Sequence, residues 1–154
     1  MKNLKKIITG VGLILANPIG EIAVVREKTS KPAVGKVAGM FTFPLETVEE
    51  GESPEKGTLK RLIREEIGVV TGMKKPRLMA FYSVMPGTVT IVYVARCEGA
   101  TFRPMAWEEV EAYGWMDPAK LLTMESRRPE VKPVMLDYLH IRQHDGRRAC
   151  GSAC

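Results

Sequence analysis

Glutamates gather between positions 46 and 66 of this 154-residue chain, on both sides of a segment with helical character. Six of them stand close together in sequence: Glu46, Glu49, Glu50, Glu52, Glu65 and Glu66. Neighbouring carboxylates repel one another, and a bound divalent cation, which prefers oxygen ligands, is one way to offset that repulsion. The alternative is a solvated acidic loop, with Glu66 reaching water at the end of the helix. Spacing alone leaves both interpretations open.

The helix that carries the last two glutamates has clear boundaries. Ser53 is a good N-cap because its hydroxyl can accept a hydrogen bond from the first turn, and Pro54 suits the first helical position. Gly68 suits a left-handed C-cap, so the sequence predicts a helix over residues 54–67.

One face of this predicted helix is apolar except for a single acid. At 100° per residue, Leu59, Leu62, Ile63 and Glu66 fall on one stripe, and Glu65 lies beside it. An ionised carboxylate on an apolar stripe needs a cation, a hydrogen-bond donor or water. Glu66 is therefore a candidate ligand.

The same segment resembles the Nudix box, which is written G-x5-E-x7-R-E-U-x-E-E-x-G-U, where U is an aliphatic residue. An aromatic-x-F-P stretch often precedes the box in that family. The residues that match are Phe41, Phe43, Pro44, Glu49, Glu50, Gly51, Glu52, Arg61, Ile63, Glu65, Glu66, Gly68 and Val69. The resemblance implies an α/β protein with the Nudix fold, a mixed β-sheet sandwiched between helices in an α/β/α arrangement.

Three residues depart from the family pattern. Leu45 and Glu46 stand where the family has two glycines, and Leu62 stands where it has a principal metal-binding glutamate. An apolar side chain cannot bind Mg²⁺. Glu46 or Glu49 could supply a substitute carboxylate from the loop. Restoring the acid with Leu62→Glu is then expected to raise metal affinity.

The spacing within the box is also unusual. Eight residues rather than seven separate Glu52 from Arg61, and Gly57 is the expected site of the insertion. The resemblance implies that Glu52, Glu65 and Glu66 bind Mg²⁺ or Mn²⁺. It also implies that Arg61 holds the carboxylates by charge-assisted hydrogen bonds.

The implied reaction is hydrolysis of a nucleoside diphosphate linked to another moiety. Water attacks a phosphorus atom, and the divalent metal offsets charge on the phosphate oxygens. The alternative function is a catalytically impaired Nudix-fold module that binds a nucleotide or a protein. Fold alone does not distinguish the two.

Further site residues are expected outside the box. In many Nudix proteins a late loop adds a metal ligand or general base, and here Glu108, Glu109 and Glu111 are candidates, with Glu109 chosen. Arg26 is a candidate for contact with substrate phosphate or base, although a solvated charge at a strand end is the favoured interpretation. Tyr82 could line a base-binding cleft, although aromatic residues in strands more often pack against neighbours.

The C-terminal segment contains four residues of the types that bind zinc. His140 and His144 are one helical turn apart, and Cys150 and Cys154 follow. Zn²⁺ is the less favoured interpretation, because chain ends are usually poorly ordered. We expect a single domain over residues 1–144 and a flexible tail over residues 145–154.

Composition narrows the class of protein. The chain has a net charge of +5, which mildly favours polyanionic partners such as nucleotides. Its basic residues are scattered and aromatic residues make up only 6% of the chain, which argues against a nucleic-acid groove. No apolar run is long enough to span a bilayer, so no membrane partner is expected. A homodimer is compatible with the sequence.

The first residues allow two interpretations. Lys2, Lys5 and Lys6 before an apolar run resemble a secretory signal, whereas β-branched residues and a following turn favour a core strand. The strand is favoured, which implies a cytoplasmic protein.

The remaining elements follow from periodicity and turn residues. Residues 29–36, 71–76 and 98–107 are expected as loops or connectors, and a C-terminal helix should start near Pro129 or Pro133, with Leu136 and Ile141 on its apolar side. The expected strands cover residues 5–15, 21–27, 40–44, 77–85 and 89–97. The family resemblance further implies a last strand and a short helix over residues 109–122.

Overall fold

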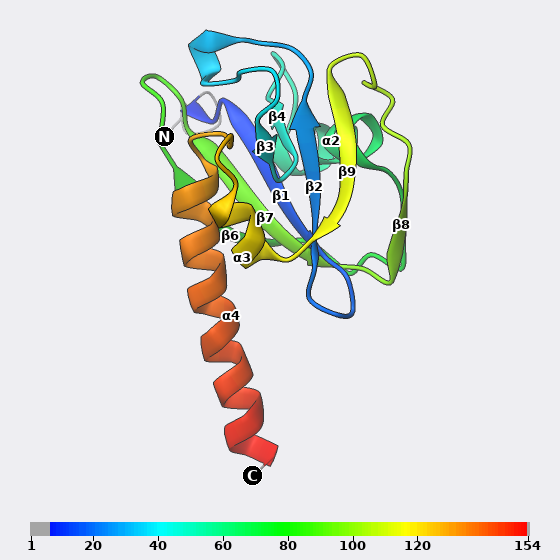
Figure 1. Ribbon diagram of the computed structural model, residues 1–154, viewed down its shortest axis with the longest axis vertical. Helices are drawn as coiled ribbons and strands as arrows, with labels where there is room; N and C mark the ends of the chain where they lie inside the picture. The colour runs from blue at the N-terminus through cyan, green and yellow to red at the C-terminus, as the bar shows by residue number, and fades with distance from the viewer. Residues whose placement is uncertain (1–6, 154) are drawn as a thin grey trace.

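The computed structural model describes the chain from residue 7 to residue 153, and its side chains from residue 7 to residue 144. A seven-stranded mixed sheet forms its centre (Figure 1). The strands of this sheet are β1 (Gly10–Ala16), β2 (Ile22–Glu27), β3 (Phe41–Thr42), β4 (Leu45–Thr47), β6 (Arg77–Tyr82), β7 (Thr90–Arg96) and β9 (Val110–Met116).

The path through the sheet runs β3-β2-β1-β7-β6, with β4 also paired to β1 and β9 to β2. Only β1 and β7 run parallel, and the other pairs are antiparallel. The strands expected at 5–15 and 21–27 correspond to β1 and β2, which pair antiparallel with Ala16 opposite Ile22. The mixed sheet predicted from the family resemblance is therefore present.

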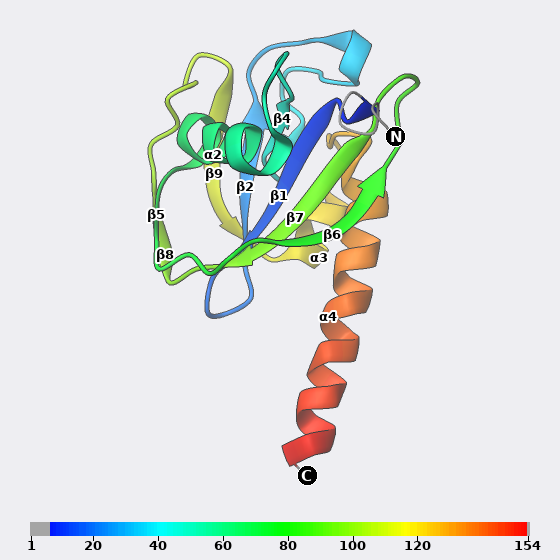
Figure 2. The same cartoon turned by 180° about the vertical axis from the view of Figure 1, so that it is seen from behind.

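Alternation along β1 shows how the sheet is covered. Ile14 and Ala16 face one hydrophobic cluster, whereas Val11, Leu13 and Leu15 face another, because successive side chains of a strand point to opposite faces. Helices α3 (Pro118–Thr123) and α4 (Val131–Ala153) cover the first face (Figure 1). The helix over residues 54–67 covers the second face (Figure 2). The expected α/β/α sandwich is confirmed.

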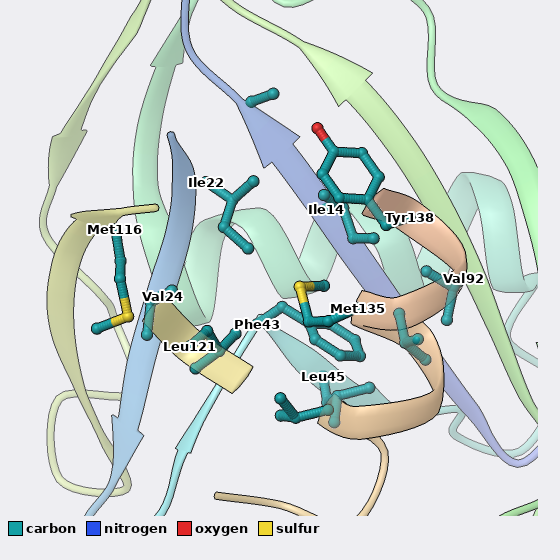
Figure 3. Close-up of a cluster of buried hydrophobic side chains, with 13 residues drawn as sticks. Ile14, Ile22, Val24, Phe43, Leu45, Val92, Met116, Leu121, Met135 and Tyr138 are labelled. Atoms are coloured by element: carbon teal, nitrogen blue, oxygen red, sulfur yellow. The ribbon is translucent and has the colours of Figure 1, made fainter. Parts of the chain in front are cut away.

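The cluster under α3 and α4 joins the helices to the sheet. Figure 3 shows Leu121 of α3 and Met135 of α4 in the same cluster as Ile14 of β1 and as Phe43, which lies between β3 and β4. Val131, Val134, Met135 and Tyr138 are the buried face of α4. Two residues expected on that face, Leu136 and Ile141, are instead 51% and 43% exposed. The helix starts at Val131 and its register turns Met135 and Tyr138 inward instead.

The helix over residues 54–67 has the expected bounds but not the expected pitch. Only α2 (Leu59–Leu62) is α-helical, and the turns at Pro54–Thr58 and Ile63–Ile67 are π-helical. At the start, the N–H of Thr58 donates to the carbonyl of Ser53 over 2.9 Å, five residues back. A π turn holds one residue more than an α turn, so this turn accommodates the additional residue near Gly57.

Both ends of this helix depend on the predicted residues. The Ser53 hydroxyl accepts a hydrogen bond from the N–H of Lys56 over 3.2 Å, which confirms the N-cap. Gly68 ends the helix at a φ of 128° and a ψ of −120°, outside the left-handed helical region that was expected. A side chain there would strike the β8 backbone, since a Cβ would lie 2.4 Å from the carbonyl oxygen of Thr101.

Several predicted segments were wrong in detail. The connector at 71–76 and the loop at 98–107 contain parts of a small antiparallel sheet, which pairs β5 (Gly68–Thr71) with β8 (Gly99–Phe102). The expected strand at 40–44 is reduced to β3, and a separate strand, β4, follows directly after it. The first strand starts at Gly10 rather than residue 5, and β6 and β7 are shorter than expected.

The C-terminal helix α4 extends to Ala153 and projects beyond the sheet (Figure 1). The predicted boundary between a domain at 1–144 and a flexible tail at 145–154 stays a prediction, because residue 154 and the side chains from 145 onward lie outside the described part. None of the helices described here has the length and apolar character needed to cross a membrane.

Candidate functional site

One guanidinium lies at the centre of the acidic residues around the helix. The Nη1 atom of Arg61 lies 3.1 Å from an oxygen of Glu46 and 3.2 Å from an oxygen of Glu65. An oxygen of Glu49 is 3.7 Å from the same nitrogen. Glu52 contacts the other edge of the guanidinium, with its two oxygens each 3.0 Å from Nε or Nη2. We call these five residues the Arg61 cluster, in which one cation contacts four carboxylates.

The carboxylate of Glu52 is fully engaged by protein donors. Arg61 binds it in a bidentate manner, and the Thr58 hydroxyl donates to Oε1 over 2.6 Å. These hydrogen bonds, above all those from Arg61, lower the pKa of Glu52 to about 2. Gly57 allows this arrangement, because a Cβ there would lie 2.6 Å from Cγ of Glu52. Glu52, expected as a metal ligand, is thus placed to orient Arg61.

Glu66 differs from its neighbour Glu65 in forming no ion pair within 4 Å in the described part of the chain, although Arg128 and Lys36 are near enough to oppose the rise of its pKa. Its side chain is buried, with 4% exposure for the residue, and its Oε2 atom has no hydrogen-bond partner in the described part of the chain. Burial, followed by the charges of Glu46 and Glu27, raises the pKa of Glu66 well above its ordinary value. Burial therefore favours the protonated carboxyl group, and the ionised form requires a compensating cation or donor.

A second group of charged residues lies nearby and is deeply buried. Glu27, at the end of β2, is 3.2 Å from Nζ of Lys36 and 3.5 Å from Nη1 of Arg128. Arg128 also lies 3.6 Å from Glu130 and donates to the carbonyl of Val34 over 3.1 Å. We call Glu27, Lys36, Arg128 and Glu130 the Arg128 cluster. It ties β2 to the loop after it and to the start of α4.

Two adjoining hollows lie between these clusters. The inner cavity has a volume of about 260 Å³, and the more open outer cleft has a volume of about 770 Å³. Glu46 and Glu109 line both. The charged residues of the inner cavity are Glu27, Glu46, Glu66, Glu109, Glu130, Lys31, Lys36 and Arg128. The charged residues of the outer cleft are Lys31, Glu46, Glu49, Arg61, Glu65, Glu108 and Glu109.

The π-helical end of the helix positions the loop that closes the outer cleft. Backbone N–H groups of Arg103, Met105 and Ala106 donate to carbonyls of the last helical turn over distances of 2.8 to 3.2 Å. These carbonyls would otherwise lack partners, because the end of a helix leaves its last C=O groups free. The loop is thereby fixed against the segment that carries Glu65 and Glu66.

This arrangement separates the three late glutamates that sequence could not rank. Glu109 lines both hollows, and its backbone is held by hydrogen bonds of 2.8 Å to Lys28 and to Ala106. Glu108 lines the outer cleft alone. Glu111 pairs with Arg26 on the strands β9 and β2 and lines neither hollow. The geometry therefore favours Glu109, the residue chosen from the sequence.

The two predicted substrate contacts lie away from both hollows. Arg26 is exposed, with its guanidinium 5.7 Å from the ring centroid of Phe41. Tyr82 donates to Asp137 of α4 over 2.7 Å, and burial followed by that hydrogen bond raises the pKa of its hydroxyl. Neither residue lines the inner cavity or the outer cleft. Their roles in binding stay predictions.

The predicted zinc ligands cannot all be placed. The rings of His140 and His144 have centroids 4.4 Å apart on α4. The side chains of Cys150 and Cys154 lie outside the described part of the chain, so this set stays a prediction. Cys97 was expected as a buried residue of the strand at 89–97; it is buried, with 6% exposure, but it lies directly after β7 rather than within it.

The residues of the hollows can be compared with what a divalent metal needs. They supply hard carboxylate oxygens, one of them the unpartnered Oε2 of Glu66. In residues 7–144, no three His, Cys, Asp or Glu side chains already converge on one ion. Glu65 and Glu46 point to Arg61 instead, and Leu62 is fully buried in the core. The donor chemistry fits Mg²⁺ or Mn²⁺, and binding requires these partly exposed carboxylates to turn from the guanidinium.

Sequence reasoning missed the Arg128 cluster. Glu27 was treated only as part of a strand, Glu130 only as a residue at the start of the C-terminal helix, and Arg128 was given no role. A usable signal was present, since Glu27 follows Ala23 and Val25 at inward-facing positions of the strand. An acidic residue that continues a buried face predicts a buried ionic partner.

Comparison with known proteins agrees with this architecture. A model of the NUDIX domain family matches residues 6–138, which is most of the chain. The chain therefore belongs to the NUDIX domain family. The resemblance inferred from the box is thus confirmed. No curated protein matches the chain.

Solved structures share the fold at low sequence identity. The NUDIX domain of Shewanella oneidensis NrtR, complexed with ADP ribose, has a TM-score of 0.65 and 17% identity, covering 90% of each chain. DR0079 from Deinococcus radiodurans has a TM-score of 0.62 and 19% identity, covering 83% of this chain and 80% of its own. A MutT NUDIX hydrolase from Burkholderia pseudomallei has a TM-score of 0.57 and 19% identity, covering 83% and 94%.

Proposed function

We propose that this chain is a pyrophosphohydrolase that cleaves a nucleoside diphosphate linked to another moiety and requires Mg²⁺ or Mn²⁺. The observation that carries the proposal is the buried Glu66, whose Oε2 has no hydrogen-bond partner among the described residues, in a cavity where acidic side chains outnumber basic ones. Membership of the NUDIX domain family supports the reaction class. The net charge of +5 suits a polyanionic substrate.

Each residue has a part that follows from its surroundings. Glu65 and Glu66 would hold the metal, which supplies Lewis-acid stabilisation of phosphate charge when bound. Glu109 is exposed at the boundary of the two hollows, where its carboxylate can accept a proton from the attacking water. Arg61, oriented by Glu52, is a positioning residue that keeps Glu65 at the cleft. Lys31, which lines both hollows, is available to contact phosphate oxygens.

A second function is favoured by one observation. Leu62 occupies a metal-ligand position of the family and is fully buried among apolar side chains, so this ligand is absent from the cleft. A module that binds a nucleotide without hydrolysing it needs no such ligand. The ADP ribose complex of the NrtR domain is a precedent for nucleotide binding in a similar fold.

A turnover assay separates the two functions. Purified protein is incubated with Mg²⁺ or Mn²⁺ and nucleoside triphosphates, nucleoside diphosphate sugars, ADP ribose or dinucleoside polyphosphates, and release of phosphate or mononucleotide is followed. We expect turnover, and we expect Glu66→Gln to reduce it by about 100-fold or more, because a ligand to the metal is lost. Glu109→Gln should lower the rate by about 100-fold, as expected for loss of a general base.

Two matched variants control this assay. Glu50→Gln and Glu111→Gln each remove an exposed carboxylate that lines neither hollow, so both should keep full turnover. Saturable nucleotide binding with no turnover in any metal would contradict the hydrolase and support the binding module. Equal loss in Glu109→Gln and Glu111→Gln would contradict the assignment of Glu109 alone.

The wider cellular setting is also part of the proposal. We expect the protein to act in the cytoplasm on a small nucleotide-type molecule rather than on nucleic acid. A homodimer stays a prediction, which size-exclusion chromatography with light scattering can test.

A further inference from the structure

The cleft lacks one carboxylate relative to the family pattern, and the core explains why it cannot be regained in place. Leu62 is fully buried, in one cluster with Leu59, Ile67 and Leu13. Packing of the helix against the sheet fixes the direction in which the side chain at position 62 points. A replacement ligand therefore has to come from another element.

Glu46 is the acid best placed to replace it. It lies on β4, which is held against β1 by pairing with Val11. Its side chain lines both the inner cavity and the outer cleft, and it is partly exposed at 21%. The family has a glycine at this position, so its carboxylate is a feature of this chain. Loop residue Glu49, the other substitute considered, lines only the outer cleft and is 67% exposed.

Glu46 and Glu65 are already close to each other. Oε1 of Glu46 and Oε2 of Glu65 lie 3.1 Å and 3.2 Å from the same atom, Nη1 of Arg61. Two oxygens that contact one nitrogen cannot be farther apart than the sum of those distances. Both carboxylates are thus held together at the outer cleft, and rotation of their side chains is required before their oxygens can reach a common ion where this cleft meets the inner cavity.

Glu66 supplies the second, independent observation. It is buried and lines the inner cavity with Glu46, and its Oε2 has no partner in the described residues. With all groups ionised, the inner cavity has five acidic and three basic side chains in its lining. The excess of two negative charges equals the charge of one divalent cation.

We propose that Glu46 takes the place of the carboxylate lost at Leu62, so that Glu46, Glu65 and Glu66 form a three-carboxylate site for Mg²⁺ or Mn²⁺. This inference rests on the metal dependence in the proposed function. The ligands come from a strand and a helix rather than from the helix alone, and the site lies where the inner cavity meets the outer cleft. Arg61 holds two of the ligands until the ion binds.

The test measures Mn²⁺ binding directly, without substrate. Isothermal titration calorimetry and the electron paramagnetic resonance spectrum of bound Mn²⁺ are recorded for the wild type and for Glu46→Gln. We expect saturable binding by the wild type and a loss of affinity of about 10-fold or more in the variant, because the number of charged ligands sets affinity at such sites. Glu65→Gln and Glu66→Gln should lose affinity to a similar degree.

Further variants protect the test against misfolding. Glu46→Gly inserts the residue of the family and should also lose affinity, whereas Glu46→Asp, which keeps the charge, should retain part of it. Glu50→Gln is the matched control and should bind Mn²⁺ as the wild type does. Thermal unfolding without metal shows that each variant is folded.

The outcomes also separate this inference from the proposed function. Unchanged Mn²⁺ affinity in a folded Glu46→Gln protein, or no saturable binding by the wild type, overturns the site even if turnover is observed. Loss of Mn²⁺ binding in Glu46→Gln supports the site even if no substrate is hydrolysed, in which case only the hydrolase assignment fails.

Discussion

The Arg61 cluster and the Arg128 cluster lie beside the same inner cavity and are built from the same residue types, yet they differ in charge balance and in exposure. One guanidinium contacts four carboxylates in the Arg61 cluster. In the Arg128 cluster, two cations contact two carboxylates, and Arg128, Glu27 and Glu130 have side chains at most 9% exposed.

This difference separates a structural ionic group from a binding site. Balanced charges buried with their partners hold elements together, and removing one partner leaves an uncompensated charge. An excess of partly exposed carboxylates costs less to maintain in water and retains free oxygens for a cation. The comparison predicts that variants in the two clusters respond differently to metal.

The largest loss of stability is expected when a charged residue replaces Leu62 in the apolar core beside the Arg61 cluster. Leu62→Glu should lower the free energy of unfolding by about 4 kcal/mol or more, because it buries a carboxylate without a partner. The structure thus contradicts the expectation that this change raises metal affinity. Chemical denaturation measures the loss, and Leu62→Met, which keeps the volume, should cost less than about 1.5 kcal/mol. Tighter Mn²⁺ binding by a stable Leu62→Glu protein would contradict the described register.

The next largest loss of stability is expected in the Arg128 cluster, where cations and carboxylates are equal in number. Arg128→Met should lower the free energy of unfolding by about 3 kcal/mol, because Glu27 and Glu130 lose a buried partner. Added Mn²⁺ should restore none of this loss. Arg26→Met, an exposed arginine on the same sheet, should change stability by less than about 0.5 kcal/mol in the same denaturation experiment. A neutral Arg128→Met would mean that the cluster contributes nothing to the attachment of α4.

A smaller loss of stability is expected in the Arg61 cluster, where carboxylates outnumber the one cation. Arg61→Met should cost about 1–2 kcal/mol, since Glu65 and Glu49 are 31% and 67% exposed and can be solvated. Here Mn²⁺ should raise the melting temperature again, because a ligand that binds only the folded state stabilises it. Thermal scans with and without Mn²⁺ measure this difference. Identical responses of Arg61→Met and Arg128→Met to Mn²⁺ would remove the distinction between the clusters.

The smallest expected effect is the pH dependence of the stability contributed by the contact between Glu52 and Arg61. Arg61 lowers the pKa of Glu52 from 4.5 to about 2 in the folded protein. The contact therefore stabilises the fold fully above pH 4.5, and this contribution is lost as the pH falls toward 2. The difference in free energy of unfolding between the wild type and Glu52→Gln, measured from neutral to acidic pH, should shrink over that range. A difference that grows on acidification would be inconsistent with the described hydrogen bonds.

Much of the fold was predictable because local signals and packing agree. Ser53 and Pro54 start the helix as capping rules require, and alternation in β1 and β7 gives a sheet that is buried on both faces. The helix carrying Glu65 and Glu66 was placed correctly for the same reason.

The rest depends on contacts that are distant in sequence. β5 and β8 are short, and they form a sheet only because the helix ends against the loop at residues 103–106. The choice of Glu109 over Glu111 depends on the strand register of β9 against β2. The first π turn accommodates an additional residue whose effect on pitch no propensity scale contains.

The wide first turn of the helix has a consequence for how such motifs vary. Because the carbonyl of Ser53 accepts from Thr58, five residues on, as well as from Gly57, four residues on, the insertion near Gly57 is absorbed before Arg61 is reached. The number of residues between the glutamate and the arginine of the motif can thus change by one while the contact between Glu52 and Arg61 is retained. Deleting Gly57 should tighten the turn to ordinary α-helical geometry, so evolutionary gain or loss of a single codon here leaves the downstream helix in phase.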